Sequence, residues 1–185
     1  MRQGVKMSFS ITKQQVLTII ATGFAIGRVP KAPGTFGSAL TFLLLYLLAC
    51  ATRLPVIELL QKTGYMFCAV IGLYALGCWA TDAYMRATGK HDPKEVVIDE
   101  IAGQWLTLTL AVYILPDWVY MQHLGIFFIL CFLFFRLFDV VKLGPVKWAD
   151  SKLDGAHGVM LDDIFAGVFA GIVTSVAMYM VVYVF

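Results

Sequence analysis

Residues 161–185 read LDDIFAGVFAGIVTSVAMYMVVYVF, an acidic pair followed by an apolar run that contains no charged residue. A helix of about 20 such residues is long enough to cross the hydrocarbon core of a bilayer. Gly167 and Gly171 within the run form a G-x-x-x-G pattern, which is typical of close contact between membrane helices. The stretch therefore predicts a membrane span with two carboxylates at its N-terminal boundary.

The rest of the chain has a similar composition. Of its 185 residues, 60% are hydrophobic and 14% are charged, whereas soluble domains have about 25% charged residues. Uncharged stretches predict about five transmembrane helices, over residues 32–52, 64–81, 101–116, 118–135 and 164–185. The third is short unless residues 96–100 extend it, and the fourth is expected to continue to residue 141. We expect one all-α polytopic membrane domain over residues 1–185, since this length corresponds to about one domain.

The distribution of positive charge predicts the orientation. Residues 16–26 are apolar but too few to cross, so they predict a short re-entrant or interfacial helix. In that case 12 Lys/Arg lie on the side of the N-terminus and of the loops at 81–95 and 136–163, and only Arg53 and Lys62 lie on the other. Because positive residues accumulate in cytoplasmic loops, we predict that the first side is cytoplasmic. Nearly all acidic residues fall on that same face.

Charge and cysteine content exclude several function classes. The formal net charge of +2 is too balanced for a nucleic-acid-binding protein. The four cysteines form no C-x-x-C pair and lie in apolar stretches, so they indicate neither a zinc site nor a disulfide framework. No protein partner can be identified from the sequence. The lipid bilayer is the partner that the composition does predict.

Two pairs of adjacent carboxylates, Asp99-Glu100 and Asp162-Asp163, each stand just before a predicted span. One such pair is readily explained as helix capping, because carboxylates favour the positive end of the helix dipole. Two pairs at the same membrane depth would repel one another unless a cation compensates them. Oxygen ligands suit Mg²⁺ or Mn²⁺. The four carboxylates are therefore candidate metal ligands and catalytic residues.

The stretch Phe135–Lys142, FRLFDVVK, places Arg136, Asp139 and Lys142 three residues apart, so all three are predicted to share one helical face. Two cations beside one acid could form a phosphate clamp, in which Asp139 orients Arg136 or joins the metal site. The alternative is a surface ion-pair ladder at a helix end.

Residues 30–38, PKAPGTFGS, predict a rigid turn before a helix that starts near Ser38. Exposed backbone N–H groups around Pro33, Gly34 and Thr35 could bind an anion. Thr35 or Ser38 could instead serve only as a helix cap.

Four blocks together resemble the bacterial phosphatidylglycerophosphatase A family. They are P-x-x-P-G-T-x-G-S at 30–38, His91-Asp92 leading to D-E-x-x-G at 99–103, F-R-x-x-D-x-x-K at 135–142 and G-x-x-x-D-D-x-x-A-G at 158–167. The chain departs from the family pattern at Leu143-Gly144-Pro145 and at Ala156-His157, which affects loops and no charged site residue. This resemblance implies an integral inner-membrane, Mg²⁺-dependent phosphatase that converts phosphatidylglycerophosphate to phosphatidylglycerol.

The resemblance also implies roles for individual residues. It implies that the catalytic residues are Asp99, Glu100, Asp139, Asp162 and Asp163. It also implies that the substrate-binding residues are Pro33, Gly34, Thr35, Ser38, His91, Arg136 and Lys142. We expect this site at the cytoplasmic face, where the phospholipid substrate would be presented. The alternative function is a divalent-cation transporter or channel that binds its ion at the acidic pairs. A third hypothesis is a non-catalytic assembly subunit, but it leaves the acidic pairs unexplained.

Overall fold

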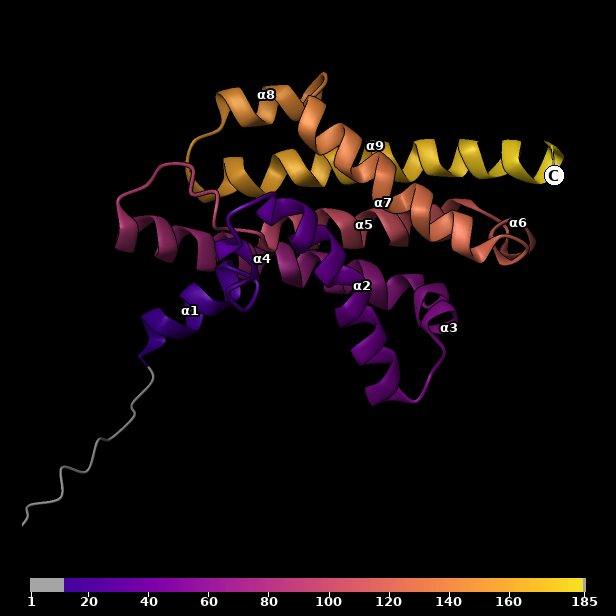
Figure 1. Cartoon of the computed structure of the whole chain (residues 1–185), viewed down its shortest axis with the longest axis horizontal. Helices are drawn as coiled ribbons and strands as arrows, with labels where there is room; N and C mark the ends of the chain where they lie inside the picture. The colour runs from indigo at the N-terminus through magenta and orange to yellow at the C-terminus, as the bar shows by residue number, and fades with distance from the viewer. Residues whose placement is uncertain (1–11, 185) are drawn as a thin grey trace, which may run out of the picture.

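The computed structural model describes residues 12–184, and the regular structure in this part of the chain is entirely helical (Figure 1). In chain order the helices are α1 (Lys13–Ala21), the 3₁₀-helix η1 (Ile26–Arg28), α2 (Pro33–Thr52), α3 (Val56–Gln61), α4 (Thr63–Thr88), α5 (Ile98–Ile114), α6 (Asp117–Met121), α7 (Leu124–Val141), α8 (Pro145–Lys152) and α9 (Gly155–Val184). The predicted all-α fold is confirmed. Arg2 and Lys6, which enter the charge comparison, and the final residue of the last predicted span lie outside the described residues.

Helices α2, α4, α7 and α9 are long and apolar enough to cross a membrane. Large apolar side chains on these helices are exposed, among them Leu43, Ile71, Leu133, Val176 and Met180. An apolar surface of this kind is suited to lipid rather than to water. The predicted count of five spans is not confirmed, because the third predicted stretch forms α5, a helix of 17 residues.

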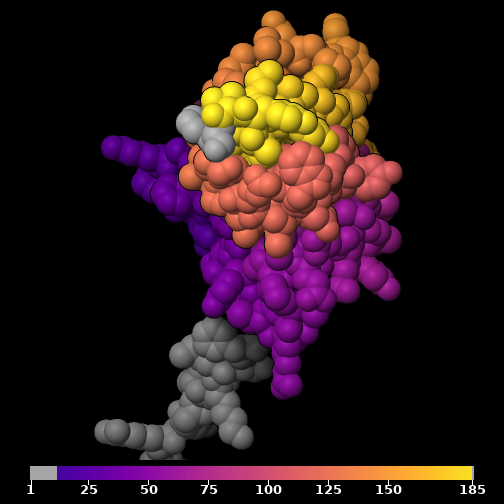
Figure 2. Space-filling view, turned by 90° about the vertical axis from the view of Figure 1, so that its right-hand side faces the viewer, coloured from indigo at the N-terminus to yellow at the C-terminus, as the bar shows by residue number. Residues whose placement is uncertain are grey.

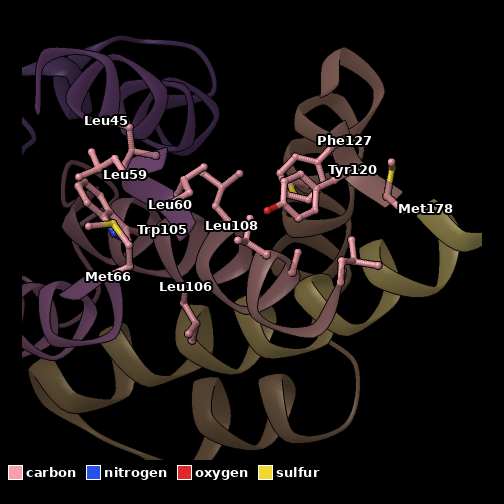
Figure 3. Packing of buried hydrophobic residues seen from close by; sticks show 14 of the residues in the cluster. Leu45, Leu59, Leu60, Met66, Trp105, Leu106, Leu108, Tyr120, Phe127 and Met178 are labelled. Carbon is pink, nitrogen blue, oxygen red and sulfur yellow. The ribbon is translucent and has the colours of Figure 1, made fainter. Parts of the chain in front are cut away.

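Helix α5 is enclosed by the other helices. Thirteen of its 17 residues are buried, and it packs against α2, α4, α7 and α9. Figure 3 shows Trp105, Leu106 and Leu108 of α5 among buried side chains from other helices, including Leu45 of α2 and Phe127 of α7. The central helix of a bundle has little surface facing lipid, which explains why it is the least exposed of the predicted spans.

Glycines bring α5 and α9 into close contact. A Cβ atom on Gly167 would lie 2.5 Å from the carbonyl oxygen of Gly103, and a Cβ on Gly103 would lie 2.5 Å from the carbonyl oxygen of Asp163. The hydroxyl of Thr107 donates to the carbonyl of Gly167 at 3.3 Å. Gly171 continues this contact against Leu110. The G-x-x-x-G pattern thus marks a helix contact, and the contact sets the two acidic pairs side by side.

The helix termini lie at two opposite ends of the bundle. Helices α2, α5 and α9 begin, and α4 and α7 end, at the end where α8 lies (Figure 1). Figure 2 views the molecule from the opposite end, where the end of α9, in yellow, lies beside the salmon-coloured α6 and α7. The acidic pairs and the Phe135–Lys142 stretch all belong to the α8 end.

Several predicted boundaries were wrong because apolar runs mark only the central part of these helices. The stretch 118–135 is divided, since residues Asp117–Met121 form α6 and α7 begins at Leu124. Its predicted continuation to Val141 is confirmed. Helix α9 begins at Gly155, so Asp162-Asp163 lies within a helix rather than before one. Capping therefore does not account for this second pair.

The N-terminal segment 16–26 does not form a span. It comprises the later part of the nine-residue helix α1, which begins at Lys13, and a turn in which Gly23, Phe24 and Ala25 all have positive φ. Helix α1 packs against α4, where Gln14 Nε2 donates to the carbonyl of Ala83 at 2.9 Å. The prediction of a short helix that does not cross agrees with this arrangement.

Candidate active site

A pocket of about 650 Å³ opens at the α8 end of the bundle. Its wall combines the start of α2, the loop before α5, the first turn of α5, the end of α7, the α8 segment and the first turns of α9. The charged side chains Asp99, Glu100, Arg136, Asp139, Lys142, Asp162 and Asp163 all line it. The structure therefore brings the charged site residues that the sequence singled out into one cavity.

Asp99, Glu100 and Asp163 form a compact acidic cluster. One carboxylate oxygen from each residue lies within 4.8 Å of the others, and Asp99 and Asp163 are buried. The glycine contact between α5 and α9 imposes this proximity, since a Cβ on Gly103 would overlap the backbone of Asp163. Buried carboxylates at such distances repel one another strongly. The cluster therefore fits a divalent cation bound through oxygen atoms.

The carboxylate of Glu100 is only partly satisfied by the residues that the structure describes. Its Oε2 atom is buried and has no hydrogen-bond partner within residues 12–184. A buried carboxylate oxygen is costly unless a donor or a cation satisfies it. Asp99 uses one oxygen to accept from the backbone N–H of Glu100 at 3.0 Å. The free oxygen of Glu100 is thus available to an ion in the pocket.

Gly34 sits against this cluster at the start of α2. A Cβ atom at this position would overlap Oε1 of Glu100 and would lie 3.1 Å from Nη1 of Arg136. Only a residue without a side chain leaves both the carboxylate and the guanidinium in place. The glycine therefore allows Glu100 of the acidic cluster and Arg136 to lie side by side at the start of α2.

We expect Gly34→Ala to lower kcat/KM for the phosphatase reaction that the sequence implies by roughly 30-fold, measured as released phosphate. A small displacement of the charged groups in the pocket is costly to the rate. The alanine itself favours the helix, so the thermal midpoint of unfolding should not fall enough to explain the loss. Gly72→Ala is the matched control, since a Cβ on this α4 glycine meets no atom within 4 Å. Equal activity of Gly34→Ala and Gly72→Ala would contradict this role.

Arg136 is held from two sides. Its Nη1 atom forms an ion pair with Asp139 at 2.6 Å and donates to Ser38 Oγ at 3.3 Å. The side chain of Ser38 in turn donates to the carbonyl of Gly34 at 3.0 Å. Both Arg136 and Asp139 are largely buried in the pocket wall. This network fixes the guanidinium, as the predicted phosphate clamp requires.

Lys142 does not share the helical face of Arg136 and Asp139, and that prediction was wrong. Helix α7 ends at Val141, and Lys142 adopts a left-handed conformation with φ 48°. Its ammonium bridges Asp150 at 2.5 Å and Asp162 at 2.7 Å. Burial alone would lower the pKa of Lys142, but the hydrogen bonds to these carboxylates outweigh it and raise the pKa above its usual value. Lys142 thus joins α8 to α9 and still lines the pocket.

The fourth carboxylate, Asp162, is placed beside Lys142 rather than in the three-residue cluster. Its other oxygen accepts from the backbone N–H of Asp163 at 3.0 Å. The structure thus separates the four predicted metal ligands into three clustered acids and one that is paired with a lysine.

The predicted substrate loop is only partly brought to the pocket. Helix α2 begins at Pro33 rather than near Ser38, and neither Thr35 nor Ser38 caps it. Pro33 and Gly34 line the pocket, as does the exposed His91 at its mouth. Thr35 does not line it, and Ser38 acts through Arg136. The stretch that the sequence predicted to be an exposed anion-binding turn instead forms the first turn of α2, in which Gly34 is buried.

Comparison with known proteins agrees with this geometry. Residues 19–178 match the family described as phosphatidylglycerophosphatase A. The chain belongs to the phosphatidylglycerophosphatase A family. Membership makes it an enzyme, a phosphatase that hydrolyses phosphoric monoesters, and the apolar helices agree with a membrane protein that acts on lipid. No solved structure matches the chain.

Three relatives of this phosphatidylglycerophosphatase A family member show how much of the chain is shared. The phosphatidylglycerophosphatase A of Escherichia coli is 35% identical over 82% of this chain and 77% of its own length. That of Haemophilus influenzae is 30% identical over 87% of this chain and 88% of its own length. A Bacteroides thetaiotaomicron protein named "Putative phosphatidylinositol-3-phosphatase" is 38% identical over 88% of this chain and 94% of its own length.

Three features of the site were not predicted from the sequence. They are Asp150 as a partner of Lys142, the short helix α8 that carries it, and the placement of Lys94 in the pocket wall. Helix α8 begins with Pro145, and because proline is common at the first position of a helix, this residue could have indicated the start of α8. Lys94 is only three residues from His91, which was predicted to bind substrate, and this proximity could have indicated that Lys94 lies in the pocket wall.

Proposed function

We propose that this membrane phosphatase removes the terminal phosphate of phosphatidylglycerophosphate with the help of Mg²⁺, giving phosphatidylglycerol and inorganic phosphate in phospholipid biosynthesis. The observation that carries the proposal is the acidic cluster of Asp99, Glu100 and Asp163 beside the fixed Arg136 in one pocket. Such a pair of features provides ligands for a hard cation and a bidentate donor for a phosphate. The pocket lies at the end of the bundle that the loop charges predict to be cytoplasmic, in a bacterial inner membrane.

Asp99, Glu100 and Asp163 would hold Mg²⁺, because their oxygens already converge and Glu100 Oε2 has no other partner within residues 12–184. When bound, the cation supplies charge to polarise the phosphate and lowers the pKa of a water molecule that it binds. Asp162 is engaged by Lys142 and would act by holding the α8 segment against α9.

Arg136 would bind the terminal phosphate. Asp139 and Ser38 keep its guanidinium in one orientation, so two of its N–H groups can face the phosphate oxygens as negative charge develops there. Gly34 lets Glu100 and Arg136 lie close to the N-terminus of α2, where the helix dipole also favours an anion. Lys142 lines the same pocket, where Asp150 and Asp162 hold its ammonium.

The reaction is a hydrolysis of a phosphate monoester. The bond between the terminal phosphorus and the glycerol oxygen breaks, an oxygen from water joins the phosphorus, and the glycerol oxygen leaves with a proton. Both direct attack by water and a transient carboxylate phosphoenzyme satisfy this balance. In either case the residues of the pocket would orient the monoester and offset its charge.

Purified full-length protein in mixed micelles provides the test. We expect phosphate release from phosphatidylglycerophosphate with Mg²⁺, at least tenfold higher kcat/KM than for phosphatidylinositol 3-phosphate, and loss of turnover in excess EDTA that added Mg²⁺ restores. A preference for phosphatidylinositol 3-phosphate would instead favour a phosphatidylinositol-3-phosphatase, the activity for which the Bacteroides relative is named. Turnover that persists in EDTA would contradict the Mg²⁺ requirement.

The cation transporter makes a different prediction. It needs polar ligands along a path through the bundle, yet the predicted span regions contain no acidic residue. Flux of Mg²⁺ into liposomes without release of phosphate from the lipid would support the transporter and contradict the phosphatase.

A further inference from the structure

We infer that Lys94, at the mouth of the pocket, binds the phosphodiester of the same lipid and so selects a headgroup with two phosphates. This inference rests on the proposed function, because it concerns the part of the substrate that remains in the product. No role was assigned to Lys94 by its sequence pattern.

Lys94 belongs to a loop that is fixed at several points. Lys90 and Glu95 form an ion pair across it, and the hydrogen bond from Lys90 lowers the pKa of Glu95. The backbone N–H of Val96 donates to the carbonyl of Pro93 at 2.9 Å. Lys94 is therefore presented to the pocket by an ordered turn rather than by a free chain.

The same loop is also anchored to the N-terminal segment. The backbone N–H of Val97 donates to the carbonyl of Ala21 at 2.9 Å. Gly27 packs so closely against the backbone of Glu95 that a Cβ atom there would overlap its carbonyl oxygen. Pro93 is buried, whereas the neighbouring Lys94 is exposed. The segment that precedes α2 thus supports the loop and gives it a fixed position beside the acidic cluster.

The charge of Lys94 is available to a ligand. Of the Lys and Arg residues that line the pocket, Arg136 is paired with Asp139, and Lys142 is paired with two carboxylates. Lys94 forms no ion pair with any residue in the described range 12–184. A cation without a carboxylate partner, facing a pocket that takes phosphate, is suited to a second anion.

The chemistry of the substrate supplies that anion at the right place. A phospholipid with a terminal phosphate monoester also carries a phosphodiester between its headgroup and its acyl glycerol. If the monoester enters toward Arg136 and the acyl chains remain in the bilayer, the phosphodiester lies toward the mouth. Asp92 and Asp154 also line the pocket, so the mouth is not a general basic patch. One cation, Lys94, is left to recognise the second phosphate.

The test separates the two phosphates by using one inhibitor for each. Inorganic phosphate represents the monoester, and glycerophosphoglycerol, the deacylated headgroup of the product, carries the phosphodiester. We expect Lys94→Gln to raise KM for phosphatidylglycerophosphate and the inhibition constant for glycerophosphoglycerol by about tenfold each, since hydrogen bonds to charged groups are of this strength. The inhibition constant for inorganic phosphate and kcat should change less than twofold, and Lys94→Arg should restore KM.

Lys31→Gln is the matched control, because Lys31 is an exposed lysine just before α2 that does not line the pocket. Unchanged constants in Lys94→Gln, equal losses in Lys31→Gln, or equal changes for both inhibitors would overturn the inference. So would failure of glycerophosphoglycerol to inhibit the wild-type enzyme. Absence of any wild-type activity on phosphatidylglycerophosphate would instead contradict the proposed function, so the two failures are distinguishable.

Discussion

Asp163→Asn is expected to lower kcat by about 10³-fold, because it removes a charged ligand from the three-carboxylate cluster. A bound cation supplies several kcal/mol of transition-state stabilisation, and each 1.36 kcal/mol corresponds to a factor of ten in rate. Asparagine preserves the shape of the side chain, so the backbone contact with Gly103 is retained. Release of phosphate from phosphatidylglycerophosphate measures the effect.

Stability provides a second readout for this variant that does not depend on activity. In EDTA, Asp163→Asn should unfold at a temperature no lower than the wild type, because one repelling carboxylate has been removed. Added Mg²⁺ should stabilise the wild type and not the variant. Glu58→Gln is the control, since Glu58 is an exposed acid at the other end of the bundle, 4.0 Å from Lys62. Wild-type turnover in Asp163→Asn would rule out the cluster as the catalytic site.

Arg136→Lys is expected to lower kcat/KM by about 10²-fold although the positive charge is kept. A lysine offers a point charge and cannot provide the planar fork that binds two phosphate oxygens. It also cannot reproduce the contacts that Arg136 makes with both Asp139 and Ser38. Loss of one preorganised donor to a developing charge commonly has an effect of this size.

The matched control for Arg136→Lys is Arg86→Lys. Arg86 is exposed and pairs with Asp82 one helical turn away, outside the pocket lining. We expect wild-type kinetics from Arg86→Lys with phosphatidylglycerophosphate as the substrate. Similar kcat/KM values for the two variants would show that Arg136 contributes charge alone and not geometry.

Local patterns in the sequence predicted most of the site. Adjacent acids at Asp99-Glu100 and Asp162-Asp163 indicated where carboxylates would gather, since both pairs border apolar runs, and all four residues line the pocket. The three-residue spacing of Arg136 and Asp139 predicted their ion pair, because such residues are neighbours on a helix. The resemblance to the phosphatidylglycerophosphatase A family predicted membership, which the match over residues 19–178 confirms.

Features that depend on tertiary structure could not be predicted in the same way. The left-handed conformation of Lys142 ends α7 and turns its side chain toward Asp150 and Asp162, which no helical periodicity reveals. The start of α9 at Gly155 was missed because hydropathy detects the apolar part of a helix and not its polar extension. The approach of Gly34 to Glu100 depends on the packing of α2 against α5.

Binding of Mn²⁺, followed by electron paramagnetic resonance, is the most direct test of the claim that Asp99, Glu100 and Asp163 hold a divalent cation. We predict that the purified wild-type protein binds Mn²⁺ and that excess Mg²⁺ displaces it. Asp163→Asn should lose this binding, and Glu58→Gln should retain it. Equal Mn²⁺ binding by the wild type and Asp163→Asn, or none by the wild type, would contradict the claim.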